Sequence, residues 1–191
     1  MINDNDLLLM LSSSLQNNET YKVYIDSSGK KTLTPQTHNW EADDPSLRIS
    51  CHSESVTVYG LLAGKNPKKV IFPNCSRAAG YKTSGAFYMA FENCTSLTSV
   101  SFPALTTATG NNNYGAFGGA FQNCTSLTSI SFPSLTTVGT ETKADVTFRS
   151  AFSNCSPSLK VHFKKSMKGK PGLDYKTMGL TSADQVVFDL P

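Results

Sequence analysis

A 14-residue block that recurs at a nearly fixed interval constrains the fold of this chain more than any other feature. The block Ala90–Pro103 returns as Ala120–Pro133 with identical residues at 12 of its 14 positions. A third copy begins at Ala151 and continues to Phe163, and a looser early copy ends at Val70–Pro73. The three clear copies begin 30 and 31 residues apart. Self-similarity at a fixed period indicates a repeat architecture in which each block contributes one coil.

Each block predicts a short strand with one buried face. Val100 and Phe102 alternate with Ser101, so their side chains lie on the same side of an extended backbone. One coil cannot bury that face by itself, and stacked coils would form a continuous core with a ladder of parallel strands. Two further rows of phenylalanine recur at the same interval, and we expect both to stack inside the coils. The rows are Phe87, Phe117 and Phe148, and Phe91, Phe121 and Phe152.

The repeated motif Ala-Phe-x-Asn-Cys-x-x-Leu-x-x-Ile-x-Phe-Pro resembles the BspA-like class of leucine-rich repeats, over about residues 60–163. The resemblance implies a leucine-rich-repeat solenoid that is mainly β with short helical turns. It also implies an adhesin-type role, because such repeats are found on bacterial surface proteins and in phage-encoded proteins. The coils of this chain are longer than the typical ~23 residues of that class. We expect the extra residues, in 78–87, 111–117 and 140–148, to form long loops on one edge of the solenoid.

Charge and repeat content divide the chain into three parts. Residues 1–59 contain eight acidic and four basic side chains, whereas the remainder contains 13 basic and six acidic ones. We assign residues 1–59 to a small β-containing cap or docking region, because exposed solenoid ends need caps. Residues 60–163 hold about four coils, and residues 164–191 form a C-terminal capping segment. The lysines of that segment are either a solvated end or an attraction for an anionic partner.

Both end segments carry signals for short elements. Asn5 or Asp6 would cap a helix in the first segment, and a turn at residues 26–29 would join two strands as a hairpin. The expected N-terminal elements are a helix over 7–15 and strands at 21–25, 31–33, 47–51 and 55–59. The expected C-terminal elements are a helical turn at 173–178 and a last strand at 185–188.

The outward positions of the predicted ladder form the first candidate binding surface. If Val100 and Phe102 point inward, small hydroxyl side chains occupy the centre of the outer face and lysines lie at its ends. Such a face offers hydroxyl and ammonium hydrogen bonds to a glycan or a protein. The alternative is an exposed sheet face that only water contacts. The candidate residues are Lys69, Ser99, Ser129 and Lys160 in one row, and Ser101, Ser131 and His162, with Ile71, in the next.

The insertion loops form the second candidate surface. Their sequences vary, whereas the strand blocks are nearly identical, so recognition would lie in the loops and the strands would serve as the scaffold. Tyrosine, asparagine, glycine and serine form adaptable recognition surfaces. The candidate residues are Tyr81, Lys82, Asn112, Tyr114 and Lys143.

The sequence contains no recognisable catalytic, phosphate-binding or metal-binding motif, and we expect no enzymatic activity, no metal and no cofactor. Cys51 and His52 are adjacent on a predicted strand, so their side chains point to opposite faces. Three cysteines, Cys94, Cys124 and Cys155, share one repeat position. We expect a ladder of buried thiols there, since free cysteine packs as a small hydrophobe. A disulfide between neighbouring coils is the alternative.

These observations predict a non-enzymatic module for adhesion, or for receptor or glycan recognition, at a bacterial or phage surface. The alternative is a structural subunit of a virion or surface assembly that uses the solenoid for protein–protein contacts. The chain has no run of about 20 apolar residues, which argues against membrane insertion. Asp4 and Asp6 precede the short apolar patch at 7–11, where a secretory signal would carry lysines. We expect an extracellular, cell-surface or virion location and no specific nucleic-acid partner.

Overall fold

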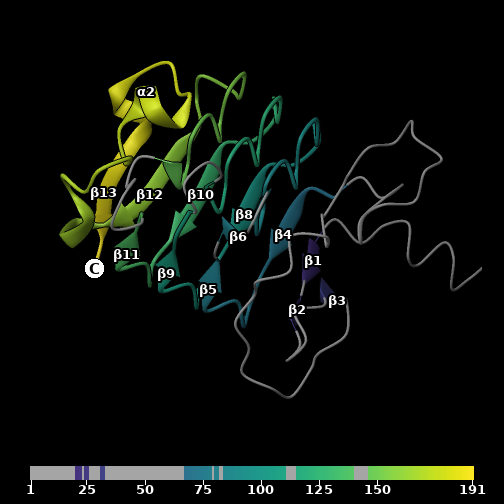
Figure 1. Ribbon diagram of the computed structural model, residues 1–191. Coiled ribbons are helices and arrows are strands. Elements are labelled where there is room, and N and C mark those ends of the chain that lie inside the picture. The colour runs from purple at the N-terminus through teal and green to yellow at the C-terminus, as the bar shows by residue number, and fades with distance from the viewer. Residues whose placement is uncertain are drawn as a thin grey trace, which may run out of the picture.

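The computed structural model describes residues 67–78, 80–81, 84–110, 115–139 and 146–191, together with three short strands within residues 20–32. In this part of the chain the repeats coil into a β-solenoid, with successive strands side by side along its axis (Figure 1). The prediction of a mainly β solenoid with a parallel strand ladder is therefore confirmed. Among the described residues, no helix is both long enough and apolar enough to cross a membrane.

The main sheet of the described part has six parallel strands in the order β1-β4-β8-β10-β12-β13. Val100 of β8 pairs with Val70 of β4 and with Ile130 of β10, which pairs in turn with Val161 of β12. The predicted register is therefore correct, because each repeat places its branched aliphatic residue at the same height. The strands are β1 (Thr20–Lys22), β4 (Lys69–Ile71), β8 (Ser99–Ser101), β10 (Ser129–Phe132), β12 (Lys160–Lys164) and β13 (Val186–Leu190).

A second, narrower parallel sheet follows the main one in each coil. It consists of β5 (Arg77–Ala78), β9 (Thr107–Ala108) and β11 (Thr137–Val138), in the order β11-β9-β5. Threonine side chains reinforce it, because the Thr106 and Thr136 hydroxyls donate to the backbone carbonyl of the preceding coil, at 3.0 and 3.2 Å. Two antiparallel hairpins complete the strands: β2 (Tyr24–Ile25) with β3 (Lys31–Thr32), and β6 (Gly80–Tyr81) with β7 (Ser84–Gly85).

Successive turns form the third side of each coil. They stack through backbone hydrogen bonds, for example from Phe91 N to the Ala120 oxygen at 2.7 Å and from Phe121 N to the Ala151 oxygen at 2.8 Å. The prediction of long loops at 78–87, 111–117 and 140–148 is wrong for the C-terminal residues of each segment. Ala86 and Phe87, Ala116 and Phe117, and Val146 and Phe148 are core residues of these turns. Buried alanine and phenylalanine contribute more stability inside the coil than in an exposed loop.

The core is built around stacked phenylalanine rings. The rings of Phe87 and Phe148 lie parallel to that of Phe117, each with a centroid distance of 5.0 Å. Phe91, Phe121 and Phe152 form a second stack with centroid distances of 5.1 and 5.3 Å. Both predicted rows are therefore confirmed. The inward phenylalanines of the main sheet form a third stack that contacts the first edge-to-face: Phe72, Phe102, Phe132, Phe163 and Phe188.

The C-terminal segment adds one irregular coil to the solenoid. Buried Met178 of the short helix α2 (Tyr175–Met178) packs into the core cluster, and Asp174 caps that helix. Two 3₁₀ turns, η2 (Lys165–Met167) and η3 (Ala183–Gln185), flank this helix. β13 then adds the last strand to the ladder. The predicted helical turn at 173–178 and last strand at 185–188 are both confirmed, with slightly different bounds.

The N-terminal predictions are tested only in part. The strand expected at 21–25 corresponds to β1 and β2, and the expected hairpin is the β2–β3 pair. β1 also joins the main sheet beside β4. The helix expected over 7–15 and the strands expected at 47–51 and 55–59 lie outside the described residues.

Candidate functional site

The first candidate surface has the predicted alignment along the main sheet. Lys69 lies opposite Ser99, Ser99 opposite Ser129, and Ser129 opposite Lys160. The two lysines are exposed, and the two serines are partly exposed. Neighbouring strands are about 4.8 Å apart. The row therefore presents two hydroxyls between two ammonium groups at a regular interval. We call this outward side of β4, β8, β10 and β12 the ladder face.

The second row of the ladder face ends in a histidine that contacts a carboxylate. Ser101 lies opposite Ser131, and Ser131 lies opposite His162. The His162 Nδ1 atom lies 3.0 and 3.1 Å from the two carboxylate oxygens of Asp189. This contact fixes the ring, so that Nε2 is the atom left to contact a ligand. Ile71 of β4 lies opposite Ser101 and is the apolar member of this row.

The sequence analysis did not identify Asp189. The pairing of β12 with β13 is regular through Phe163 and Phe188, but the next pair joins Lys164 to Leu190. This bulge leaves Asp189 without a strand partner and directs its carboxylate toward His162. By alternation Asp189 shares the outward side of β13 with Val187, the strand partner of His162. It was missed because the strand expected from the sequence ended at residue 188.

Contacts with neighbouring groups hold other side chains at the ladder face in place. The Lys160 ammonium donates to the Asp184 backbone oxygen at 2.9 Å. The hydroxyls of Thr98 and Thr128 donate to the backbone oxygens of Lys68 and Thr98, at 2.8 and 3.3 Å. These contacts restrict Lys160 and the residues that precede β8 and β10, which lowers the entropic cost of binding at those positions.

The second candidate surface is mostly untested. Tyr81 is placed only by its backbone, as the last residue of β6. Lys82, Asn112, Tyr114 and Lys143 lie outside the described residues. Their role as a recognition surface stays a prediction.

The cysteines form a ladder, as predicted, but not all of them are thiols. The Cys124 and Cys155 thiols each donate 3.0 Å hydrogen bonds, to the backbone oxygens of Phe91 and Phe121. Burial raises the pKa of Cys155 to about 12, and burial also raises the pKa of Cys124 far above its ordinary value. Both groups are therefore neutral and unreactive near pH 7. Cys94 is disulfide-bonded, so the prediction of a reduced thiol is wrong at that position.

An asparagine ladder runs beside the cysteines. Asn123 Nδ2 donates to Asn93 Oδ1 at 2.8 Å, and Asn154 Nδ2 donates to Asn123 Oδ1 at 3.0 Å. All three residues have left-handed backbones, with φ between +59° and +60°. Asparagine tolerates this conformation better than most residues. The repeated asparagine is thus explained by turn geometry and by bonding between coils.

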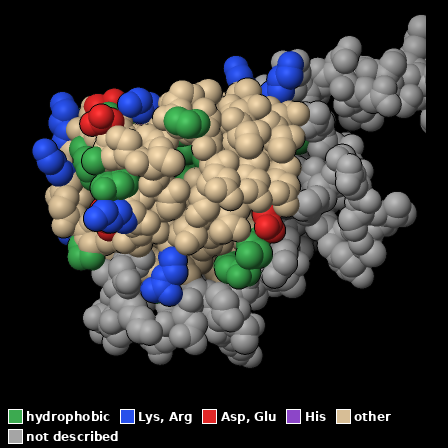
Figure 2. Space-filling model, turned by 90° about the horizontal axis from the view of Figure 1, so that it is seen from above, with side chains coloured by type: hydrophobic (Ala, Val, Ile, Leu, Met, Phe, Trp, Pro, Cys, Tyr) green, Lys and Arg blue, Asp and Glu red, His purple; other side chains and the backbone are tan. Residues whose placement is uncertain are grey.

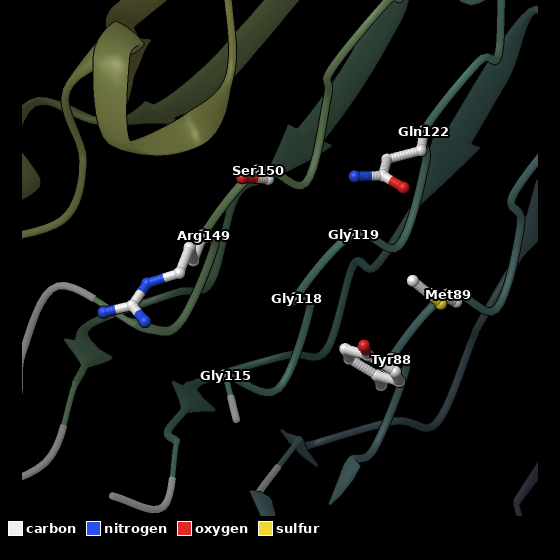
Figure 3. A pocket seen from close by; sticks show the side chains of 8 residues that line it. All are labelled: Tyr88, Met89, Gly115, Gly118, Gly119, Gln122, Arg149 and Ser150. Carbon is white, nitrogen blue, oxygen red and sulfur yellow. The ribbon is translucent and has the colours of Figure 1, made fainter. Parts of the chain in front are cut away.

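A small cavity lies on the stacked turns, and the sequence analysis did not identify it. Its volume is about 220 Å³. Gly118 and Gly119 lie between Tyr88 and Met89 on one side and Arg149 and Ser150 on the other, as Figure 3 shows. A signal for it exists in the sequence. Aligning the repeats shows Gly-Gly in the middle copy, where the copies before and after have Tyr-Met and Arg-Ser.

The described residues contain no cluster of three or more side chains that could hold a metal ion. Backbone and uncharged side chains outside the hydrophobic set cover most of the described surface in the view of Figure 2, and lysine and arginine gather toward the end that carries β13. The chain matches no protein-family model, no curated protein and no solved structure.

Proposed function

We propose that this protein is a non-enzymatic binding module that recognises a glycan or a protein at a bacterial or phage surface. One observation carries the proposal: the strand register aligns serine hydroxyls in two rows across the ladder face, with Lys69 and Lys160 at the ends of one row. Hydroxyls both donate and accept hydrogen bonds, and ammonium groups donate three.

The rigidity of the ladder supports this proposal. The inward residues of the strands, such as Val100 and Ile130, are fully or almost fully buried, and phenylalanine stacks lie beneath them. A rigid sheet holds the outward hydroxyls at fixed spacings, so that little conformational entropy is lost on binding. The resemblance to BspA-like repeats agrees with an adhesin role and with display at the surface of a cell or virus particle.

A binding screen tests the proposal. Purified protein is applied to intact bacterial cells and to an array of bacterial and host glycans, at low and at physiological ionic strength. We expect saturable binding that persists at physiological salt. Binding that disappears with salt would indicate only attraction by the basic end, because screening weakens long-range charge interactions. No binding under either condition would contradict the proposal.

Two variants locate the binding surface. Replacing Ser99 and Ser129 with glutamate adds two charges at the centre of the ladder face, whereas Tyr114→Ala removes one side chain from the predicted loop surface. The matched control places glutamates at Thr95 and Thr125, which are exposed in the same two coils but lie outside the strands. Loss of binding in the serine variant alone assigns recognition to the ladder face. Loss in Tyr114→Ala alone assigns recognition to the loops.

A second candidate function is a structural subunit, and one observation favours it. β13 is the last strand of the main sheet in the described part of the chain, and four of its five residues are only half-buried: Val186, Val187, Phe188 and Leu190. A half-buried apolar edge strand is a template for pairing with another chain. Light scattering after size-exclusion chromatography tests this function. An oligomer that Val187→Lys converts to a monomer would support assembly, and a monomeric wild-type protein would count against self-assembly.

A further inference from the structure

The cavity on the stacked turns occupies one repeat position across three coils. The backbone bonds from Met89 N to the Gly118 oxygen and from Gly119 N to the Arg149 oxygen, at 3.1 and 3.0 Å, fix this register. The middle coil has no side chains at a position where the coils on either side carry Tyr88 and Arg149. The missing side chains leave an opening between the aromatic ring and the guanidinium (Figure 3).

The two glycines form the floor of this opening. A Cβ atom on Gly118 would lie 3.3 Å from Cδ2 of Tyr88, and one on Gly119 would lie 3.4 Å from Cγ of Met89. The Tyr88 ring therefore lies directly against the bare backbone of Gly118. A larger side chain at residue 118 would displace that ring and fill the cavity.

The backbone adds an independent indication that these walls have a role. Met89, Gly119 and Ser150 occupy equivalent places and have φ values of +50°, +60° and +53°. Glycine adopts this conformation without strain, whereas methionine and serine do not. Residues held in such conformations cluster at binding sites. Both strained residues line the cavity.

The size of the cavity limits the ligand to one ring. The volume of about 220 Å³ lies below the range of about 300–1,000 Å³ that is usual for drug-sized ligands. Two steps between coils, of about 4.8 Å each, separate the coil of Tyr88 from that of Arg149. That separation leaves room for a single six-membered ring between the two side chains.

The lining selects a ring that is apolar on one face and anionic at its edge. The Tyr88 ring can pack against the C–H face of a sugar, and the guanidinium of Arg149 can hold a carboxylate with two parallel hydrogen bonds. The Gln122 amide and the Ser150 hydroxyl can bond to ring hydroxyls. Gln122 occupies the place that Glu92 has in the preceding coil, and the described residues that line the cavity include no aspartate or glutamate. The lining therefore suits an anion.

We propose that this cavity binds a single pyranose ring bearing a carboxylate, such as a terminal acidic sugar of a surface glycan. The inference rests on the proposed binding function and adds to it a second contact, of defined ligand chemistry, on a different side of the coil from the ladder face.

Titration of the full chain, followed by amide nuclear magnetic resonance, tests the proposal. The probes are methyl glucuronide and methyl glucoside, which differ only in the carboxylate. We expect methyl glucuronide to shift the amides of Gly115, Gly118 and Gly119 saturably, and methyl glucoside to bind at least about tenfold more weakly, since charge-assisted bonds are the strong ones. Equal binding of the two probes, or shifts only outside the cavity, would overturn the proposal.

Three variants sharpen this test. Arg149→Gln should lower the affinity for methyl glucuronide to that for methyl glucoside, and Gly118→Leu should abolish both interactions by filling the cavity. Lys168→Gln removes the same charge from an exposed residue that does not line the cavity, and it should bind as the wild type does. Unchanged binding by Gly118→Leu would refute the site. If the cavity fails these tests while cells or glycans still bind through the ladder face, only this inference fails, and the proposed function stands.

Discussion

At the scale of single residues, the asparagine ladder shows why one residue type recurs in every coil. A left-handed backbone costs most residues about 1–2 kcal/mol, and asparagine less than most. The side chain of Asn123 also bonds to Asn93 and Asn154. Backbone conformation and hydrogen bonding thus favour the same residue at each of these turns.

Replacing Asn123 should separate these two contributions. We expect Asn123→Ala to lower the free energy of unfolding by about 2–3 kcal/mol, through backbone strain and the loss of two hydrogen bonds. Asn123→Gly loses the same bonds without the strain, and it should cost about 1 kcal/mol less. Urea denaturation measures both values. Equal losses would show that the left-handed backbone contributes nothing.

Burial of the Cys124 thiol predicts its chemical behaviour. Because burial raises its pKa, the thiol stays protonated in the folded protein at pH 8, whereas an unfolded cysteine is partly ionised there. We expect negligible alkylation of Cys124 in native protein at pH 8 and rapid alkylation in urea, measured by mass spectrometry of its peptide. Above about pH 8.5 the thiol ionises only in the unfolded chain, because its pKa is raised in the folded protein. The free energy of unfolding should therefore fall as the pH rises above that value. Rapid native alkylation would contradict this burial.

At the scale of elements, the phenylalanine stacks connect every coil to the next. Phe117 lies between two parallel rings at 5.0 Å and contacts Phe102 and Phe132 edge-to-face. Phe188, at the end of its stack, is only partly buried and stacks on Phe163 alone in the described part. The middle of the solenoid should therefore depend on its rings more than the C-terminal end does.

Truncating a ring in each place tests this difference. We expect Phe117→Ala to cost about 3–5 kcal/mol of unfolding free energy, the usual value for a fully buried phenylalanine. Phe188→Ala should cost less than half as much, since that side chain is only partly buried. Chemical denaturation of both variants checks the ranking. A larger loss for Phe188→Ala would mean that the C-terminal coil, and not the central stack, limits stability.

The helix α2 in the C-terminal segment offers an element-scale test with a pH dependence. The Thr177 backbone N–H donates to the Asp174 carboxylate at 3.0 Å, and this bond lowers the pKa of Asp174. Because the pKa of Asp174 is lower in the folded protein than the value of about 3.9 in the unfolded chain, its carboxylate stabilises the fold above that unfolded pKa. This stability is lost as the pH falls through the pKa of Asp174 in the folded protein. Asp174→Ala should cost about 1 kcal/mol at pH 7 and almost nothing near pH 2, by denaturant titration. A loss independent of pH would contradict the capping role.

Some elements were predictable from the sequence, and others were not. The strands β8 and β10 follow from the alternation of Ser and Val or Ile in long, nearly identical blocks. The second sheet has strands of only two residues, such as Thr107–Ala108, which are too short to show alternation. Gly115 was assigned to an insertion, yet a Cβ there would lie 1.7 Å from the Val146 oxygen, so close packing of the coils explains this glycine. Close approach of two coils leaves no periodic signal in a single sequence.

At the scale of the whole molecule, the repeat creates surfaces because it places equivalent residues of successive coils side by side. The serine rows were predictable because the copies are identical there. The cavity arises where the copies differ, at Gly118 and Gly119, and recognising it requires comparing copies position by position. The contact between His162 and Asp189 involves the end of β13, which lies outside the repeated blocks. Regular features could therefore be predicted, whereas features that interrupt the repeat required the structure.

Binding of wild-type and variant protein to intact cells, or to the best ligand of the glycan array, tests the central claim most directly. The affinity of the wild type is compared with that of the double Ser99→Glu, Ser129→Glu variant at physiological salt, with the glutamate variant of Thr95 and Thr125 as control. For the serine variant we predict a loss of affinity of about tenfold or more, and tenfold is equivalent to about 1.4 kcal/mol of binding free energy. For the control we predict a loss of affinity of less than about twofold. Equal affinities in all three proteins would contradict recognition by the ladder face.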